Sequence, residues 1–129
     1  MALVVPNSAD LLMLNYILSS PSGGVLLRLF KNNLTPSKST VIGDITECDE
    51  AGYVAKTLSY ASWTIDTVEG SNLAVYPLQD FTFSEEATIY GFYGTTTSDQ
   101  LLFIEKFPTA YTLAVDGGTV GIIPKLNLN

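Results

Sequence analysis

Apolar residues near the start of the chain recur at the spacing of an α-helix. They share one face of a helical projection, and they are Leu11, Leu14, Ile17 and Leu18. Ser8 precedes them as a suitable N-cap. Pro21 and the glycines at 23–24 cannot continue a helix, so the pattern predicts one helix that ends near Ser19.

From residue 24 onward the apolar positions recur with a period of two, which is typical of β-strands. Val25, Leu27 and Leu29 form the core face of the first strand, and Trp63 and Ile65 point inward from a later one. The predicted strands lie at residues 24–31, 53–58, 62–68, 79–84, 89–95, 101–107, 111–115 and 119–128.

Turn-forming residues separate these strands. Residues 69–72 predict a turn, and the sequence Asp-Gly-Gly at 116–118 predicts a hairpin. Pro77 indicates a strand edge or a bulge. Residues 39–52 lack alternation, which predicts a long acidic loop with a helical turn.

Seven or eight short strands after a single helix predict a mainly β fold. We expect an antiparallel jelly-roll-like sandwich with one N-terminal helix, and an immunoglobulin-like sandwich is the alternative. The 129 residues suit a single β-sandwich domain over residues 1–129, in which residues 1–22 form an N-terminal arm and the helix. Residues 1–7 are apolar, and we expect this arm to reach onto a neighbouring subunit.

The charge balance argues against nucleic acid as a direct partner. Six Lys and Arg residues against thirteen Asp and Glu residues give a formal charge of −7, and the cations are dispersed along the chain. The start of the chain lacks the pattern of a secretory signal, and polar residues interrupt residues 11–27, so we expect neither export nor a membrane span. With 47% hydrophobic residues, the chain has more apolar surface than one small core needs, which hints at burial against another chain.

The residue types give little support to catalysis. The chain has no histidine, which removes the usual general base, a common zinc ligand and any Ser-His-Asp arrangement. Cys48 is the sole cysteine, so it cannot form an internal disulfide, which fits a reducing cytoplasm. Glu47 and Asp49 raise the pKa of its thiol by like-charge repulsion, and no neighbour along the chain opposes them. We therefore expect an unreactive cysteine.

Three other patterns have a functional interpretation and a simpler structural one. The acidic residues Asp44, Glu47, Asp49 and Glu50 could offer oxygen ligands to calcium, but they match no loop pattern, and solvated loop charges are the favoured interpretation. The glycine turns at 22–24 and 116–118 could bind an anion, but neither precedes a helix. Four aromatic residues could form a sugar platform, although a core position is favoured for the tryptophan; they are Trp63, Tyr60, Tyr76 and Tyr90. We assign no catalytic, cofactor-binding or metal-binding residue and expect no cofactor.

Several segments together resemble a family of tailed-bacteriophage virion proteins. The resemblance rests on turn and core residues over most of the chain, namely 26–36, 52–53, 56–58, Trp63, 81–83 and 89–93. The family consists of small β-sandwich virion structural proteins that decorate or cement icosahedral heads, often as trimers.

The resemblance implies a non-enzymatic structural protein that bridges capsid subunits. Its implied partners are the major capsid protein and further copies of itself as a homotrimer, without direct nucleic acid or membrane contacts. Its implied location is the capsid surface, after assembly in the host cytoplasm. The alternative is a carbohydrate-binding or receptor-binding module of a phage fibre, with surface aromatic residues as the binding platform.

Overall fold

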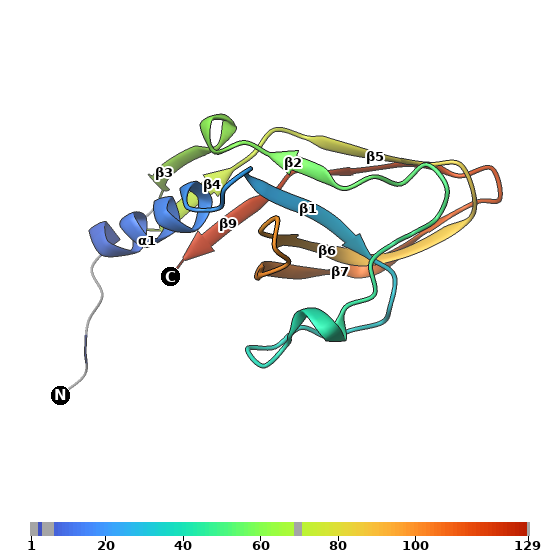
Figure 1. Ribbon diagram of the computed structural model, residues 1–129, viewed down its shortest axis with the longest axis horizontal. Helices are drawn as coiled ribbons and strands as arrows, with labels where there is room; N and C mark the ends of the chain where they lie inside the picture. The colour runs from blue at the N-terminus through green and yellow to red at the C-terminus, as the bar shows by residue number, and fades with distance from the viewer. Residues whose placement is uncertain (1–2, 4–6, 69–70, 129) are drawn as a thin grey trace.

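A computed structural model describes Leu3, residues 7–68 and residues 71–128 (Figure 1). One α-helix and two 3-10 helices accompany nine strands in this part of the chain. In chain order they are α1 (Asn7–Ser19), β1 (Val25–Phe30), η1 (Ile42–Asp44), β2 (Lys56–Leu58), η2 (Tyr60–Ser62), β3 (Thr64–Val68), β4 (Ser71–Val75), β5 (Gln79–Phe83), β6 (Ala87–Thr95), β7 (Leu101–Leu113), β8 (Gly118–Ile122) and β9 (Lys125–Leu128).

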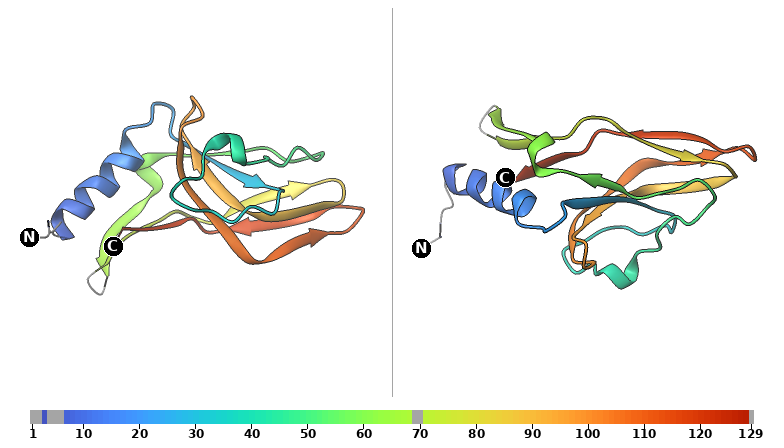
Figure 2. Two further views of the ribbon diagram at one scale, coloured as in Figure 1. Left: turned by 90° about the horizontal axis from the view of Figure 1, so that it is seen from below. Right: turned by 45° about the horizontal axis from the view of Figure 1, so that its top comes forward.

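The strands form two layers, seen from two further directions in Figure 2. One layer is an antiparallel sheet with the order β2-β1-β6-β7. The other layer contains the two-stranded sheet β5-β8 and the three-stranded sheet β3-β4-β9, and the chain runs on from β4 to β5 and from β8 to β9. The predicted class, a mainly β antiparallel sandwich with one N-terminal helix, is confirmed.

The core lies between the layers and extends beneath α1. Val25, Leu27 and Leu29 of β1 are fully buried, as the alternation predicted. The remaining cluster combines helix residues with aromatic and aliphatic residues of the other strands, namely Leu14, Leu18, Cys48, Leu58, Trp63, Ala74, Tyr76, Phe81, Phe83, Ala87, Ile89, Phe92, Val120 and Ile122.

The predicted elements differ from the structure at several boundaries. The helix begins at Asn7, so Ser8 is its second residue and not its N-cap. Ser71 and Asn72, which we took for part of a turn, are the first two residues of β4. The segments predicted at 101–107 and 111–115 are one strand, β7, because Pro108 lies in an edge strand where its missing N–H breaks no ladder.

The last predicted strand divides at Pro124, which separates β8 from β9. The turn at 116–118 is present, with Gly117 in the left-handed region at φ 85° and its N–H donating to Ala114 O. The strands on either side of this turn do not form the predicted hairpin ladder, because β7 pairs with β6 and β8 pairs with β5. The predicted turn at 69–72 lies partly outside the described residues, at 69–70.

Side-chain contacts hold the loop between β1 and β2 on the sandwich. Arg28 Nη1 donates to Glu47 Oε1 at 2.8 Å, and the Tyr53 hydroxyl donates to Glu47 Oε2 at 2.7 Å. The Tyr53 oxygen also accepts the N–H of Leu29 at 3.1 Å. Residues 42–44 form the predicted helical turn, so this acidic segment is an ordered loop.

Candidate docking surface

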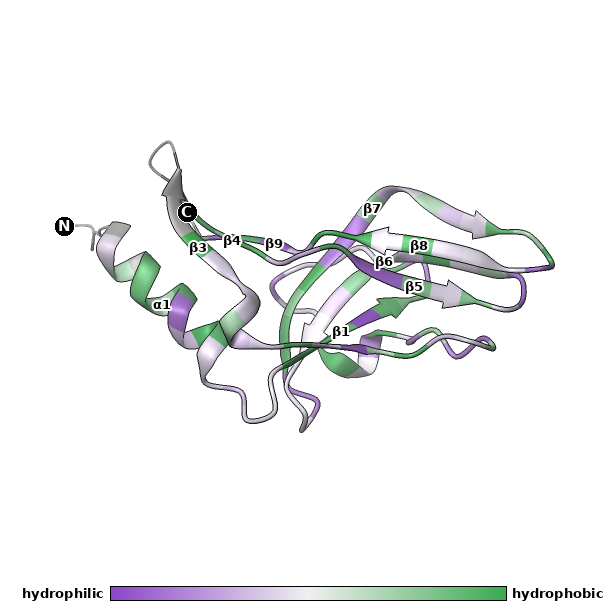
Figure 3. Ribbon diagram, turned by 90° about the horizontal axis from the view of Figure 1, so that it is seen from above, coloured by the Kyte–Doolittle hydropathy of each residue, from purple (hydrophilic) through white to green (hydrophobic). Residues whose placement is uncertain are grey.

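Three large apolar side chains lie exposed on one face of α1. Leu12 is 71% exposed, Tyr16 is 69% exposed and Met13 is 46% exposed. We call these three residues the α1 apolar face. Figure 3 shows α1 at one end of the molecule, with several hydrophobic segments interrupted by a hydrophilic one.

The exposure follows from a helix that is apolar on both of its sides. Leu14 and Leu18 are buried and belong to the core cluster, on the side where α1 packs against β3, β4 and β9. Leu12 and Tyr16 lie on the opposite side, since four residues bring a helix back to the same face. A helix that is hydrophobic all round is typical of a helix buried on all sides, yet the sandwich covers only one side of α1.

The 3-10 helix η2 holds one edge of this surface in place. Tyr60, in η2, donates from its hydroxyl to Asn15 Oδ1 at 2.9 Å and is itself 43% exposed. A hollow of about 500 Å³ is lined by the three face residues together with Ile17. The α1 apolar face is therefore a formed feature of the folded chain.

The three residues of the α1 apolar face carry no charge. Residues 11–27 carry no charge, although the whole chain has a formal charge of −7. The described salt bridges are made by Arg28, which pairs with Glu47 and Asp99, and by Lys31, which pairs with Asp49 and Glu50. Hydrophobic contact is therefore the interaction that this part of the protein can offer.

The residues proposed as a sugar platform do not share an exposed surface. Trp63 and Tyr76 are each 7% exposed and pack edge to face in the core, with ring centroids 5.1 Å apart. The core position favoured for Trp63 is thus confirmed, although its indole N–H has no hydrogen-bond partner among the described residues. Tyr90 is half-buried in β6, which leaves Tyr60 as the exposed member.

The acidic segment is engaged in ion pairs on its sandwich side. Glu47 accepts from Arg28, and Asp49 accepts from Lys31, whose ammonium holds the pKa of the Asp49 carboxyl below its usual value. Asp44 is exposed and accepts the backbone N–H of Val41. Among the described residues, no three Asp, Glu or Cys side chains gather closely enough to hold a metal ion.

Cys48 is buried and belongs to the hydrophobic core cluster. Burial, followed by repulsion from Glu50, raises the pKa of its thiol to about 12. The sequence-based reasoning identified the direction but missed Lys31, which lies close enough to oppose the shift. The thiol stays protonated at neutral pH, and the predicted lack of reactivity has this physical basis.

The two glycine turns are tight connections in the chain. Gly23 and Gly24 adopt φ values of 82° and 86° just before β1, and Gly117 lies between β7 and β8. The element directly after each of these turns is a strand, β1 in one case and β8 in the other, and not a helix. The predicted N-terminal arm at 1–7 lies outside the described residues, apart from Leu3 and the Asn7 that begins α1.

The sequence contained one signal for the α1 apolar face. The excess of apolar residues hinted at burial against another chain, but it did not point to a place. Comparisons with protein-family models, with curated proteins and with solved structures find no match for this chain. In the described part of the chain, no helix has the length and apolar character needed to cross a bilayer.

Proposed function

We propose that this chain is a non-enzymatic virion structural protein, a capsid decoration or cement protein that stabilises a phage head by bridging capsid subunits. Its partner is the major capsid protein, and it acts at the capsid surface as a homo-oligomer, most simply a trimer. The observation that carries the proposal is the α1 apolar face, which is folded, uncharged and uncovered.

Burial of this face against a partner is favourable because it removes large apolar side chains from water. Leu12 and Tyr16 are each more than two-thirds exposed, and apolar burial gains about 25 cal/mol per Å². A set of exposed apolar anchors on one helix fits the recognition mode in which a helix lies in a groove of its partner. The resemblance of the sequence to head-decorating proteins supplies the partner.

The size of the surface favours attachment in several copies. A helix of 13 residues is about 20 Å long, so one face of it falls short of the roughly 800 Å² per partner of a standard stable interface. A single copy would bind weakly. Joining copies around an axis raises the overall affinity by a factor on the order of 10² to 10⁴ without any new contact.

The proposal is tested with undecorated heads of the parent phage. Purified protein should sediment with the heads and raise their melting temperature. The double variant Leu12→Ser and Tyr16→Ser should bind at least tenfold more weakly while it keeps its own fold. The control is Val54→Ser, which removes a side chain that is 67% exposed on the loop before β2.

Two outcomes would contradict the proposal. One is wild-type protein that neither sediments with the heads nor changes their melting temperature. The other is equal binding by the double variant and by the Val54→Ser control, which would show that the α1 apolar face takes no part in attachment.

A further inference from the structure

The chain turns sharply between β7 and β8, but the two arms of this turn separate instead of pairing. Ala114 and Gly117 form an isolated bridge at the turn itself. Beyond it, β7 pairs with β6, β8 pairs with β5 and β9 pairs with β4. Each arm therefore has one edge without a strand partner among the described residues. Unpaired edges are the places where a sheet accepts a further strand.

A groove runs between the two arms. One hollow of about 430 Å³ lies between residues 107–111 of β7 and residues 121–122 of β8. A second, of about 300 Å³, lies between residues 103–105 of β7 and residues 125–127 of β9. The two hollows follow one another along the same pair of arms, so we call them together the β7–β9 groove.

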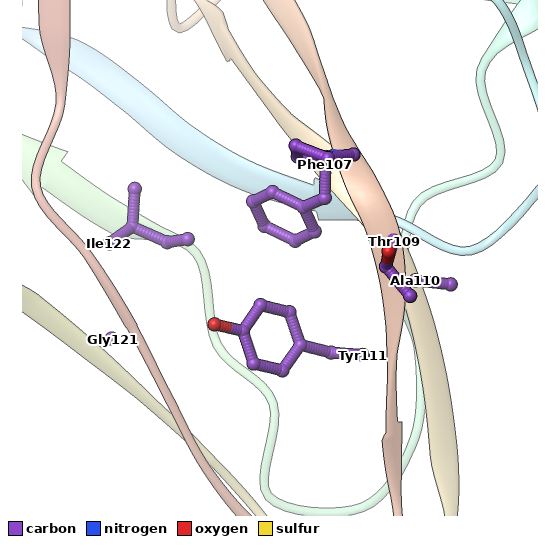
Figure 4. A pocket seen from close by; sticks show the side chains of 7 residues that line it. Phe107, Thr109, Ala110, Tyr111, Gly121 and Ile122 are labelled. Atoms are coloured by element: carbon purple, nitrogen blue, oxygen red, sulfur yellow. The ribbon is translucent and has the colours of Figure 1, made fainter.

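Aromatic rings line the larger hollow, as Figure 4 shows. Phe107 and Tyr111 project from β7 towards β8, and their rings meet edge to face with centroids 5.3 Å apart. Gly121 contributes no side chain on the opposite wall, and Ile122 contributes an apolar one. Tyr111 is 52% exposed, so the larger hollow is open to solvent. The smaller hollow is mixed in character, because Glu105, Lys125 and Asn127 line it together with apolar residues.

The pairing of β7 also departs from a regular ladder beside this hollow. Ile89 faces Tyr111, whereas Gly91 faces Lys106, so residues 107–110 bulge out of the ladder. Pro108 within the bulge has no N–H to offer. An incoming extended segment would therefore find its backbone partners mainly on the free edges of β8 and β9, and apolar contacts on β7.

The chain itself carries a segment whose chemistry matches that of the larger hollow. Residues 1–6 read Met-Ala-Leu-Val-Val-Pro, with no charged side chain and with two β-branched residues. Leu3 is the member of this segment that the structure describes, and it is 93% exposed. Six extended residues span about 20 Å, and residues 103–111 of β7 span about 30 Å, so the segment fits within the groove.

We propose that the β7–β9 groove binds residues 1–6 of a second copy of this chain as an added strand. A second copy is favoured over the same chain because of where the larger hollow lies. α1, which follows this segment, packs against β3, β4 and β9, whereas the β8 wall of the larger hollow lies further from α1 (Figure 3). The contact joins different surfaces of the two copies, so repeating it gives a closed ring or an open chain. The proposal does not depend on capsid binding, because self-association is measured without heads.

The test uses two full-length variants that each damage one side of the contact. Leu3→Asp places a charge in the segment, and Tyr111→Asp places one in the groove. Leu3 is 93% exposed and Tyr111 is 52% exposed, so the fold should persist, which far-UV circular dichroism checks. Val54→Asp is the matched control, because Val54 is 67% exposed on the loop before β2 and does not line the groove. Sedimentation velocity measures self-association at protein concentrations of roughly 1 to 100 µM, a range that covers micromolar dissociation constants.

Wild-type protein and the Val54→Asp control should self-associate equally. The Leu3→Asp and Tyr111→Asp variants should each associate at least tenfold more weakly. An equimolar mixture of these two should form a species of twice the monomer mass, because the intact segment of one variant fits the intact groove of the other.

Three results would overturn the proposal. Wild-type protein that stays monomeric throughout shows that no second copy occupies the groove. Self-association that survives both substitutions places the interface elsewhere, for example on the α1 apolar face. A mixture of the two variants that stays monomeric shows that the segment and the groove do not bind each other.

Discussion

Two leucines two positions apart on α1 should affect different properties of the protein when each is replaced by alanine. Leu14 is fully buried in the core cluster, whereas Leu12 is 71% exposed on the α1 apolar face. Leu14→Ala should affect the stability of the chain, and Leu12→Ala should affect its attachment to heads. Because both substitutions remove the same atoms from the same helix, any difference between them comes from the two environments.

The magnitudes follow from burial. Removing a fully buried leucine costs about 3 kcal/mol. At about 2.1 cal/mol/K per residue, the entropy of unfolding for 129 residues is about 0.27 kcal/mol/K, so Leu14→Ala should lower Tm by about 11 °C. Complete burial of a leucine gains about 2 kcal/mol, of which folding has captured about 0.6 kcal/mol at Leu12, so Leu12→Ala should lower Tm by only about 2 °C.

The remaining gain at Leu12, about 1.4 kcal/mol, is available to docking and corresponds to a tenfold change in affinity. Thermal unfolding followed by circular dichroism measures the first effect, and titration of heads with labelled protein measures the second. If Leu12→Ala lowers Tm as much as Leu14→Ala does, our assignment of the two helix faces is wrong. Unchanged head affinity for Leu12→Ala at full occupancy of folded protein would refute the docking role.

Three further predictions concern the loop, the cysteine and the turn. Tyr53→Phe removes a hydroxyl that donates to Glu47 and accepts from Leu29, so the free energy of unfolding should fall by about 2 kcal/mol in urea titrations, and a change below about 0.5 kcal/mol would mean that these bonds do not hold the loop. Burial holds the pKa of the Cys48 thiol at about 12, so a thiol reagent at pH 8 should react only after unfolding by urea, and rapid labelling of the native protein would contradict the buried position. Gly117→Ala should destabilise the chain by more than about 1 kcal/mol, because φ is 85° there and an added Cβ would strike a backbone carbonyl of β5; an unchanged urea midpoint would argue against this turn geometry.

Local patterns were enough to predict the strands whose two faces differ in polarity. The alternation in β1 placed Val25, Leu27 and Leu29 in the core, and the strand predicted at 79–84 is present as β5, with Phe81 and Phe83 buried. These predictions succeeded because one face of each strand meets the other layer and the opposite face does not. The helix end near Ser19 was predicted correctly for a similar local reason, since proline and glycine follow it.

Local patterns failed where the partner of a segment decides its structure. Ser71 and Asn72 are typical turn residues, yet they belong to β4 because β3 and β9 pair with it on both sides. The Asp-Gly-Gly turn predicted a hairpin, but its two arms joined different layers. Pairing between distant segments overrode the local preference in both cases.

The sequence by itself determined the class of the fold, the single helix, the acidic charge and the absence of histidine chemistry, because these depend on composition and on short-range periodicity. The tertiary structure alone decided which leucines of α1 are buried and which are exposed, and it alone separated the arms around Gly117 into a groove. Exposure is a property of the whole packing arrangement, so identical residues two positions apart can stabilise the core in one case and face solvent in the other.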